Sequence, residues 1–271
     1  MNHKVDTLNQ DDIAAYMVTN WVGKSLVFLE ETGSTNVEAA ALAGKNYPEG
    51  TLVVANRQTG GKGRRGRNWH TEAGTSIAMS LLLKPKLEAE YASMLTLIQG
   101  LAVAKTIEEV CGLQPQIKWP NDVLVNEKKV CGILTEMIME KTQIASIIIG
   151  TGINVNQENF PKEISEIATS LKIEKKEAQS GVKLIVGICK YFETYFERFL
   201  ESKDLSFVLE EYNSYLISRS RRVKVLDPQG EFEGETLGIT ALGELLVRKD
   251  NLEVVKVYAG EVSVRGIYGY V

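Results

Sequence analysis

The pattern of apolar residues changes near residue 218, and this change limits the architectures open to the 271-residue chain. Before it, apolar residues recur at helical spacing in 182–200 and in strict alternation in 75–83. After the cation-rich junction 218–222, only short runs typical of strands remain, separated by glycine, proline and an Asp-Asn pair. We therefore predict two domains, residues 1–218 and 219–271, of which the second is a small β-barrel.

The larger domain is predicted to contain both strands and helices. Strands are expected over 25–30, 51–56, 75–83, 123–125, 130–139 and 144–155, and helices over 35–44, 88–110, 182–200 and 205–217. Thr35 followed by Glu38 predicts a capping box where the first of these helices begins. Ser76, Ala78 and Ser80 share one face of their strand, and such small side chains leave room for a ligand or a close-packed helix.

Composition and charge exclude several classes of protein. The net charge of -4 argues against a dedicated nucleic-acid binder, because such proteins bind by neutralising phosphates. Three widely separated cysteines, Cys111, Cys131 and Cys189, predict neither disulfides nor a zinc site. The longest apolar run, 144–150, is too short to cross a bilayer, and the first residues do not resemble a signal peptide. We therefore expect a cytoplasmic protein without a membrane partner.

The segment Gln58–Trp69 concentrates glycines and cations in a chain that is acidic overall. Four glycines and four cations, Lys62, Arg64, Arg65 and Arg67, lie within ten residues. Glycine lets backbone amides approach phosphate oxygens, and arginine makes forked contacts to the same oxygens. The segment lacks the Gly-Lys-Ser/Thr ending of a Walker A motif. It is predicted to be an active-site loop ordered by an anion; a solvated basic loop or an RNA-binding patch is the alternative.

Four shorter stretches carry further candidates. Lys118-Trp119-Pro120-Asn121-Asp122 offers amide and carboxylate groups for a nucleotide or Mg²⁺, or is simply a turn with a packed tryptophan. Lys129 opens the returning strand of a hairpin beside Gly132, where most lysines are merely solvated. Gly33-Ser34-Thr35-Asn36 begins a helix, where hydroxyls and amides cap the helix or bind a carbonyl. Gly150 to Val155 is a strand whose glycines indicate close approach of a backbone or ligand.

Taken together and in this order, these stretches resemble the biotin protein ligases, with weaker matches at 169–171 and 260–263. The resemblance covers about Ser25 to Arg265 and depends mainly on the arginine segment and Lys118–Asp122. It implies an α+β fold in which a mixed central β-sheet is flanked by helices, as in class II aminoacyl-tRNA synthetases, and an SH3-like C-terminal β-barrel. Only about twenty-four residues precede the first strand, which predicts a ligase without an N-terminal DNA-binding domain.

The resemblance also implies roles for individual residues. Lys129 and Arg64 would be catalytic. Biotin would be bound by Ser34, Thr35, Asn36, Gln58, Lys62, Gly63, Arg64, Lys129 and Gly132. ATP would be bound by Arg64, Arg65, Trp69, Lys118, Asn121, Asp122 and Asn154. Magnesium would arrive with ATP, and Asp122 is the candidate contact. Lys62 stands where the family often has arginine and cannot make a forked contact, so a backbone role is the alternative for it.

The activity implied by the resemblance has two steps. Biotin and ATP form biotinyl-5′-AMP, and a lysine of a biotin carboxyl carrier domain then takes the biotin. The enzymatic alternative is a lipoate or octanoate ligase or transferase of the same core fold. The non-enzymatic alternative is a nucleic-acid-binding protein, whose affinity would fall steeply with salt. The sequence leaves a homodimer open.

Overall fold

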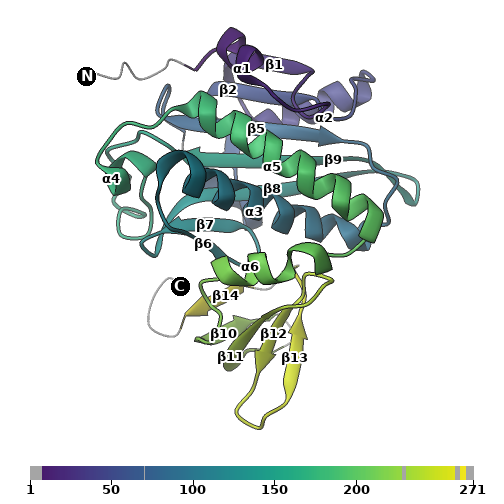
Figure 1. The fold of residues 1–271 in the computed structure, drawn as a ribbon, viewed down its shortest axis with the longest axis vertical. Helices are drawn as coiled ribbons and strands as arrows, with labels where there is room; N and C mark the ends of the chain where they lie inside the picture. The colour runs from purple at the N-terminus through teal and green to yellow at the C-terminus, as the bar shows by residue number, and fades with distance from the viewer. Residues whose placement is uncertain (1–7, 70, 228–229, 260–262, 267–271) are drawn as a thin grey trace.

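The computed structural model describes residues 8–69, 71–227, 230–259 and 263–266, and its larger part is built on a seven-stranded sheet (Figure 1). In spatial order the strands are β1 (Leu26–Thr32), β2 (Leu52–Gln58), β5 (Ser76–Leu83), β9 (Gln143–Asn154), β8 (Lys128–Glu140), β7 (Asp122–Val125) and β6 (Pro115–Lys118). β1 and β2 are parallel, and every other neighbouring pair is antiparallel. The sheet is therefore mixed, as expected.

Helices cover both faces of this sheet. The long helices α3 (Ala92–Cys111) and α5 (Gly181–Ser202) pack together over one face (Figure 1). On β5 the alternate residues Ile77 and Met79 belong to the large core beneath these helices, whereas Leu82 packs in a smaller cluster with Ala39 of α2. Helix α2 (Thr35–Gly44) thus lies on the opposite face. The short helices are α1 (Gln10–Tyr16), α4 (Leu171–Lys175) and α6 (Leu209–Tyr215).

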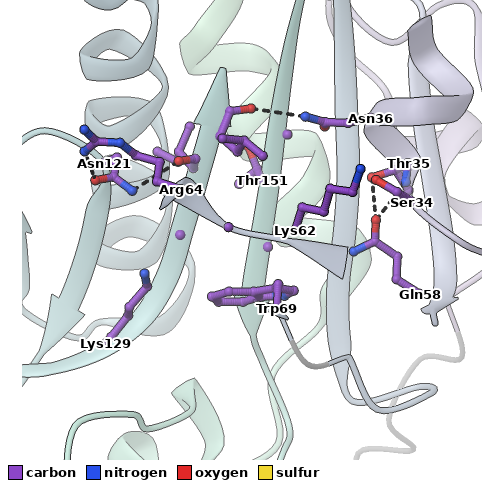
Figure 2. Close-up of a pocket in the computed structure, with 16 residues that line it drawn as sticks. Ser34, Thr35, Asn36, Gln58, Lys62, Arg64, Trp69, Asn121, Lys129 and Thr151 are labelled. Atoms are coloured by element: carbon purple, nitrogen blue, oxygen red, sulfur yellow. Dashed lines mark hydrogen bonds between the residues drawn. The ribbon is translucent and has the colours of Figure 1, made fainter. Parts of the chain in front are cut away.

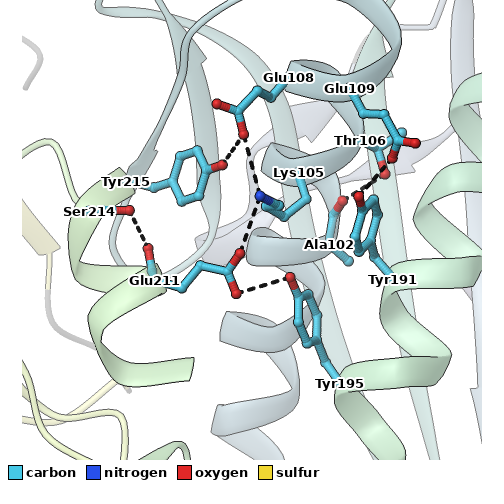
Figure 3. Close-up of polar contacts among 10 residues, drawn as sticks. All are labelled: Ala102, Lys105, Thr106, Glu108, Glu109, Tyr191, Tyr195, Glu211, Ser214 and Tyr215. Atoms are coloured by element: carbon cyan, nitrogen blue, oxygen red, sulfur yellow. Dashed lines mark hydrogen bonds and ion pairs between the residues drawn. The ribbon is translucent and has the colours of Figure 1, made fainter. Parts of the chain in front are cut away.

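Helix α6 leads into the C-terminal part and is fixed to the main body by polar contacts (Figure 3). The Lys105 Nζ on α3 lies 3.3 Å from a carboxylate oxygen of Glu211, and the Tyr195 hydroxyl on α5 donates to the same carboxylate at 3.2 Å. Tyr215 donates to Glu108 of α3. These contacts join three helices and so set where the C-terminal strands begin.

The C-terminal part is a five-stranded antiparallel sheet, which fits the expected SH3-like barrel. In spatial order its strands are β13 (Val254–Val257), β12 (Leu245–Arg248), β11 (Phe232–Ile239), β10 (Arg222–Leu226) and β14 (Ser263–Gly266). It contacts the larger part directly, since the Trp119 indole donates to the Gly243 carbonyl at 3.0 Å. The expected fold class is confirmed. A domain boundary after residue 218 stays a prediction, and Gly260, Glu261 and Val262 lie outside the described residues.

Most predicted elements are present, and their ends follow the expected local rules. The helix predicted over 35–44 has those bounds, and α3 is capped by Gly112, which follows Cys111 and adopts a left-handed φ of 61°. The capping box is wrong. Ser34 rather than Thr35 is the N-cap residue, and the Glu38 carboxylate accepts a hydrogen bond from the Thr32 hydroxyl at 2.7 Å. Strand β6 and helices α1 and α4 are present although the sequence patterns do not predict them.

The glycine-and-arginine segment is more ordered than a loop. It forms a two-stranded hairpin from β3 (Gly61–Lys62) and β4 (Asn68–Trp69), joined by a 3₁₀ turn (Arg64–Gly66). The turn is closed by a hydrogen bond from the Gly63 amide to the Arg67 carbonyl at 2.7 Å, and Arg65 has a left-handed φ of 58°. The prediction of a loop is corrected in this respect. No helix in the described ranges is long and apolar enough to cross a membrane.

Candidate active site

Two adjoining cavities open on the face of the sheet that also carries α2 and the hairpin 61–69. The smaller is a partly open cavity of about 490 Å³, and all nine residues predicted for biotin line it. The larger, an open cleft of about 1740 Å³, is lined by all seven residues predicted for ATP. Both are lined by Gly63, Arg64, Trp69, Asn121 and Lys129. The sequence candidates are thus brought together, and these five residues mark the junction of the two cavities.

The smaller cavity has one polar wall, built where α2 begins and β2 ends (Figure 2). The Gln58 Oε1 accepts from the Thr35 amide at 2.7 Å and lies 3.0 Å from the Thr35 hydroxyl. The Ser80 hydroxyl lies 2.6 Å from the Asn36 Oδ1, and the Asn36 amide donates to Glu136 of β8 at 2.5 Å. Ser34 makes no capping hydrogen bond through its side chain. This wall therefore presents amide and hydroxyl groups that are already held in place by one another.

Small residues on three neighbouring strands make room for the side chains above them. Gly152 lies opposite Ala78 of β5 on one side and Gly132 of β8 on the other. A Cβ added at Gly152 would lie 2.3 Å from the Trp69 ring, and one at Gly150 would lie 2.2 Å from the Asn36 Oδ1. The close approach predicted for the glycines of β9 is therefore made by side chains of the protein. Trp69 and Asn36 are seated directly on the sheet.

The larger cleft is strongly cationic. Among the residues that the structure describes, its lining has six cations, Arg64, Arg65, Arg67, Lys118, Lys129 and Arg265, and one carboxylate, Asp122. At the junction, Arg64 donates to the Asn121 Oδ1 at 2.8 Å. The Lys129 Nζ donates to the Asp122 Oδ1 at 2.6 Å and lies 5.6 Å from the centroid of the Trp69 ring. Burial lowers the pKa of Arg64. The negative charge of Asp122 raises this pKa, and the positive charges of the neighbouring arginines lower it further. Such a cleft suits a polyanion.

Burial lowers the pKa of Lys118 more than it lowers the pKa of Arg64. Burial, together with the charges of Lys129, Arg265 and Arg67, lowers its pKa to about 8, although Asp122 acts in the opposite direction.

Within the described ranges no three His, Cys, Asp or Glu residues are grouped so that they could hold a metal ion by themselves. Asp122 with nearby amide oxygens does fit Mg²⁺ that arrives on phosphates, because Mg²⁺ commonly takes only one or two carboxylates from a protein.

Several lining residues are not among the sequence candidates. In the smaller cavity these are Ile133, Leu134, Gly150, Thr151 and Gly152. In the cleft they are Arg67, Asn68, Trp119, Pro120, Gln157, Phe160, Pro161, Ile164, Ile167, Ala168, Val264 and Arg265. Arg67, Trp119 and Gly152 lie inside the sequence motifs themselves, so adjacency could have found them. The stretch 157–168 has neither periodicity nor motif, and no signal marks it.

A small polar cavity that opens through shared cations into a cleft suited to a polyanion is the arrangement expected of a ligase that activates a small acid on a nucleotide. Residues 29–154 match the biotin/lipoate A/B protein ligase family, and residues 221–265 match the biotin protein ligase C-terminal domain. The bifunctional ligase/repressor BirA of Bacillus subtilis is 37% identical over 262 residues, which cover 96% of this chain and 80% of that protein. The chain belongs to the biotin protein ligase family.

Solved structures agree with this assignment. A biotin protein ligase from Aquifex aeolicus in complex with biotin and ATP superposes with a TM-score of 0.79 at 32% identity, covering 90% of this chain and 99% of that one. The biotin–[acetyl-CoA-carboxylase] ligase of Mycobacterium tuberculosis is 33% identical over 153 residues, 55% of each chain. The C-terminal match and these relatives favour biotin over lipoate as the acid.

Proposed function

We propose that this chain condenses biotin with ATP to form biotinyl-5′-AMP and then transfers the biotin to a lysine of a biotin carboxyl carrier domain. The observation that carries the proposal is the junction of the two cavities, lined by Arg64, Asn121 and Lys129. An acid in the smaller cavity and a nucleotide in the cleft would meet there. Proximity and fixed positive charge would supply the rate enhancement.

The biotin ring occupies the polar wall of the smaller cavity in this proposal. Its ureido group needs both donors and acceptors, and the Ser34, Thr35 and Asn36 side chains offer them where α2 begins. Because Gln58 and Ser80 already fix Thr35 and Asn36, little side-chain entropy is lost when the ring binds. The biotin carboxylate then lies toward the junction, near Arg64 and Lys129.

The cleft receives the nucleotide. Cations of the hairpin and of β6 and β8 compensate the phosphate charges, and Trp69 offers an aromatic surface. Bound Mg²⁺ would offset further phosphate charge, with Asp122 and an amide oxygen of Asn121 or Asn154 as its protein contacts. Lys129 and Arg64 would stabilise the charge that builds up as the carboxylate attacks the α-phosphate. The hairpin 61–69 would keep water from the reactive mixed anhydride.

The second step needs no nucleophile from this chain, because the acceptor lysine attacks the acyl carbon and AMP leaves. Burial raises the pKa of the one cysteine next to the junction, Cys131, far above its usual range, which removes it as a competing nucleophile. We propose that the enzyme acts in the cytoplasm on a carboxylase carrier domain. A homodimer stays a prediction.

The proposal is tested by trapping the intermediate. The protein is mixed with labelled biotin, MgATP and pyrophosphatase in the absence of any carrier, and then separated from small molecules by gel filtration. One equivalent of biotinyl-AMP should elute with the protein, and label should not be retained when a non-hydrolysable α,β-methylene ATP replaces ATP. Octanoate or lipoate in place of biotin should give no adenylate. Equal retention of lipoyl-AMP would instead support the lipoate alternative.

The affinity for MgATP should fall as the pH rises above about 8. Phosphates bind protonated Lys118 more tightly than neutral Lys118, so the pKa of Lys118 in the free enzyme, about 8, sets where affinity is lost. Between pH 7 and 9.5 the KM for ATP should rise several-fold while the KM for biotin changes little. Lys118→Arg, which stays charged, should flatten the pH profile. An identical profile in this variant would remove Lys118 from nucleotide binding.

A further inference from the structure

Gln157 is a buried polar residue of the cleft that no sequence motif marks. It lies three residues after the end of β9, is 5% exposed, and lines the larger cavity. Its backbone carbonyl accepts a hydrogen bond from the Ser170 hydroxyl at 2.6 Å, and Ser170 also caps α4. The main chain at Gln157 is therefore fixed by the fold, independently of what its side chain does.

The side chain of Gln157 is not satisfied within the protein. Its Oε1 is buried and has no hydrogen-bond partner in the described part of the chain. A buried acceptor without a partner is unfavourable, and an apolar side chain of the same shape would avoid that loss. A buried amide oxygen without a partner at the wall of a ligand cleft therefore points to a polar group of the ligand, which it would meet once the carboxamide turns toward the cleft. Asn154 differs, since its amide already donates to the Thr169 carbonyl at 3.0 Å.

The surroundings of Gln157 indicate which part of the ligand this is. The same stretch of chain adds the apolar side chains Phe160, Ile164 and Ile167 to the cleft. Apolar surface suits a heterocyclic base, whereas the six cations of the cleft come from the hairpin 61–69 and from β6, β8 and β14 and suit phosphates. The Gln157 carboxamide thus lies next to an apolar surface that suits a heterocyclic base.

We propose that Gln157 is the residue by which the enzyme selects adenine. This inference rests on the proposed use of ATP. A glutamine carboxamide can accept a hydrogen bond from the adenine 6-amino group through Oε1 and donate to a neighbouring ring nitrogen through Nε2. Rotation about the last side-chain torsion is soft, so the amide can present either end to the base. A purine without the 6-amino group leaves the acceptor unpaired and binds less well.

The test compares ATP with purine riboside 5′-triphosphate, which lacks only the 6-amino group, by biotin-dependent pyrophosphate release. Wild-type enzyme should prefer ATP by about 10- to 100-fold in kcat/KM. In Gln157→Met, which keeps the shape but removes the amide, this preference should fall to about twofold or less. The KM for biotin should not change. The melting temperature of the unliganded variant should equal or exceed that of wild type, because an unpaired buried acceptor has been removed.

Gln143→Met is the matched control, since Gln143 is exposed at the distant start of β9, and it should keep the full preference. The inference is overturned if Gln157→Met discriminates as wild type does, or if wild type uses both nucleotides equally. A drop in melting temperature with unchanged discrimination would show a structural role only. If wild type releases no pyrophosphate with biotin and ATP, the proposed function fails instead, so the two failures are distinct.

Discussion

Replacing Lys129 with alanine should slow adenylate formation by a hundredfold or more. Lys129 lines both cavities, and its ammonium group is held between Asp122 and the Trp69 ring. There it would offset the repulsion between the biotin carboxylate and the phosphates, an electrostatic effect worth ~3 kcal/mol when a preorganised group is lost. Removal would also leave the Asp122 carboxylate without its 2.6 Å partner beside the phosphates. Single-turnover pyrophosphate release measures the rate directly.

Lys128 provides the control for this substitution, because it is the adjacent lysine on β8 and is exposed outside both cavities. Lys128→Ala should leave the rate within about twofold of wild type, as expected for a surface change. An unchanged rate in Lys129→Ala would remove this lysine from the chemistry. Equal losses in both variants would mean that general charge, and not the position of the ammonium group, matters.

Gly152→Ala should reduce adenylate formation by at least a hundredfold while the protein stays folded. The new Cβ would lie 2.3 Å from the Trp69 ring, a separation that cannot be kept, and the indole would have to move off the sheet. Trp69 ends the hairpin 61–69, so the backbone that carries Arg64 would move with it. A displacement of about 1 Å in a positioning group can lower a rate about a hundredfold. Pyrophosphate release and circular dichroism together separate lost activity from lost folding.

Gly44 supplies the matched control, since a Cβ there would meet nothing within 4 Å and its φ is ordinary for an L-residue. Gly44→Ala should retain full activity with equal or slightly higher stability, because alanine is the better helix former. If Gly152→Ala turns over at the wild-type rate, activity does not require contact between the Trp69 ring and the sheet at Gly152. The position of Arg64 would then not depend on that contact.

Dense local patterns such as 61–69 and 118–122 mark the site in the sequence, and every candidate taken from them lines one or both cavities. Their separate roles toward biotin and ATP stay predictions. Long periodic elements such as α3 and α5 are also predictable. The short strand β6 is not, since its four residues are too few to show a period and its pairing with β7 is a tertiary contact.

What the sequence could not supply depends on contacts between distant residues. Thr35 and Glu38 have the spacing of a capping box, but Thr35 is hydrogen-bonded to Gln58 instead, and the Glu38 side chain is hydrogen-bonded to Thr32. The local preference for a capping box is therefore outweighed by hydrogen bonds to residues that are distant in the sequence and form the polar wall of the cavity. Gln157 shows the same limit, because a glutamine in an irregular segment has no signal until its burial and its unpaired Oε1 are known.

In the proposed reaction an acid and a nucleotide are joined where the two cavities meet, and the adenylate is held there until a lysine arrives. The most direct measurement is a chase of the gel-filtered complex with a biotin carrier domain in the absence of ATP. We predict that one equivalent of carrier gains biotin, detected by intact mass, and that one equivalent of AMP is released. Carrier that stays unmodified until ATP is added again would contradict the proposed reaction.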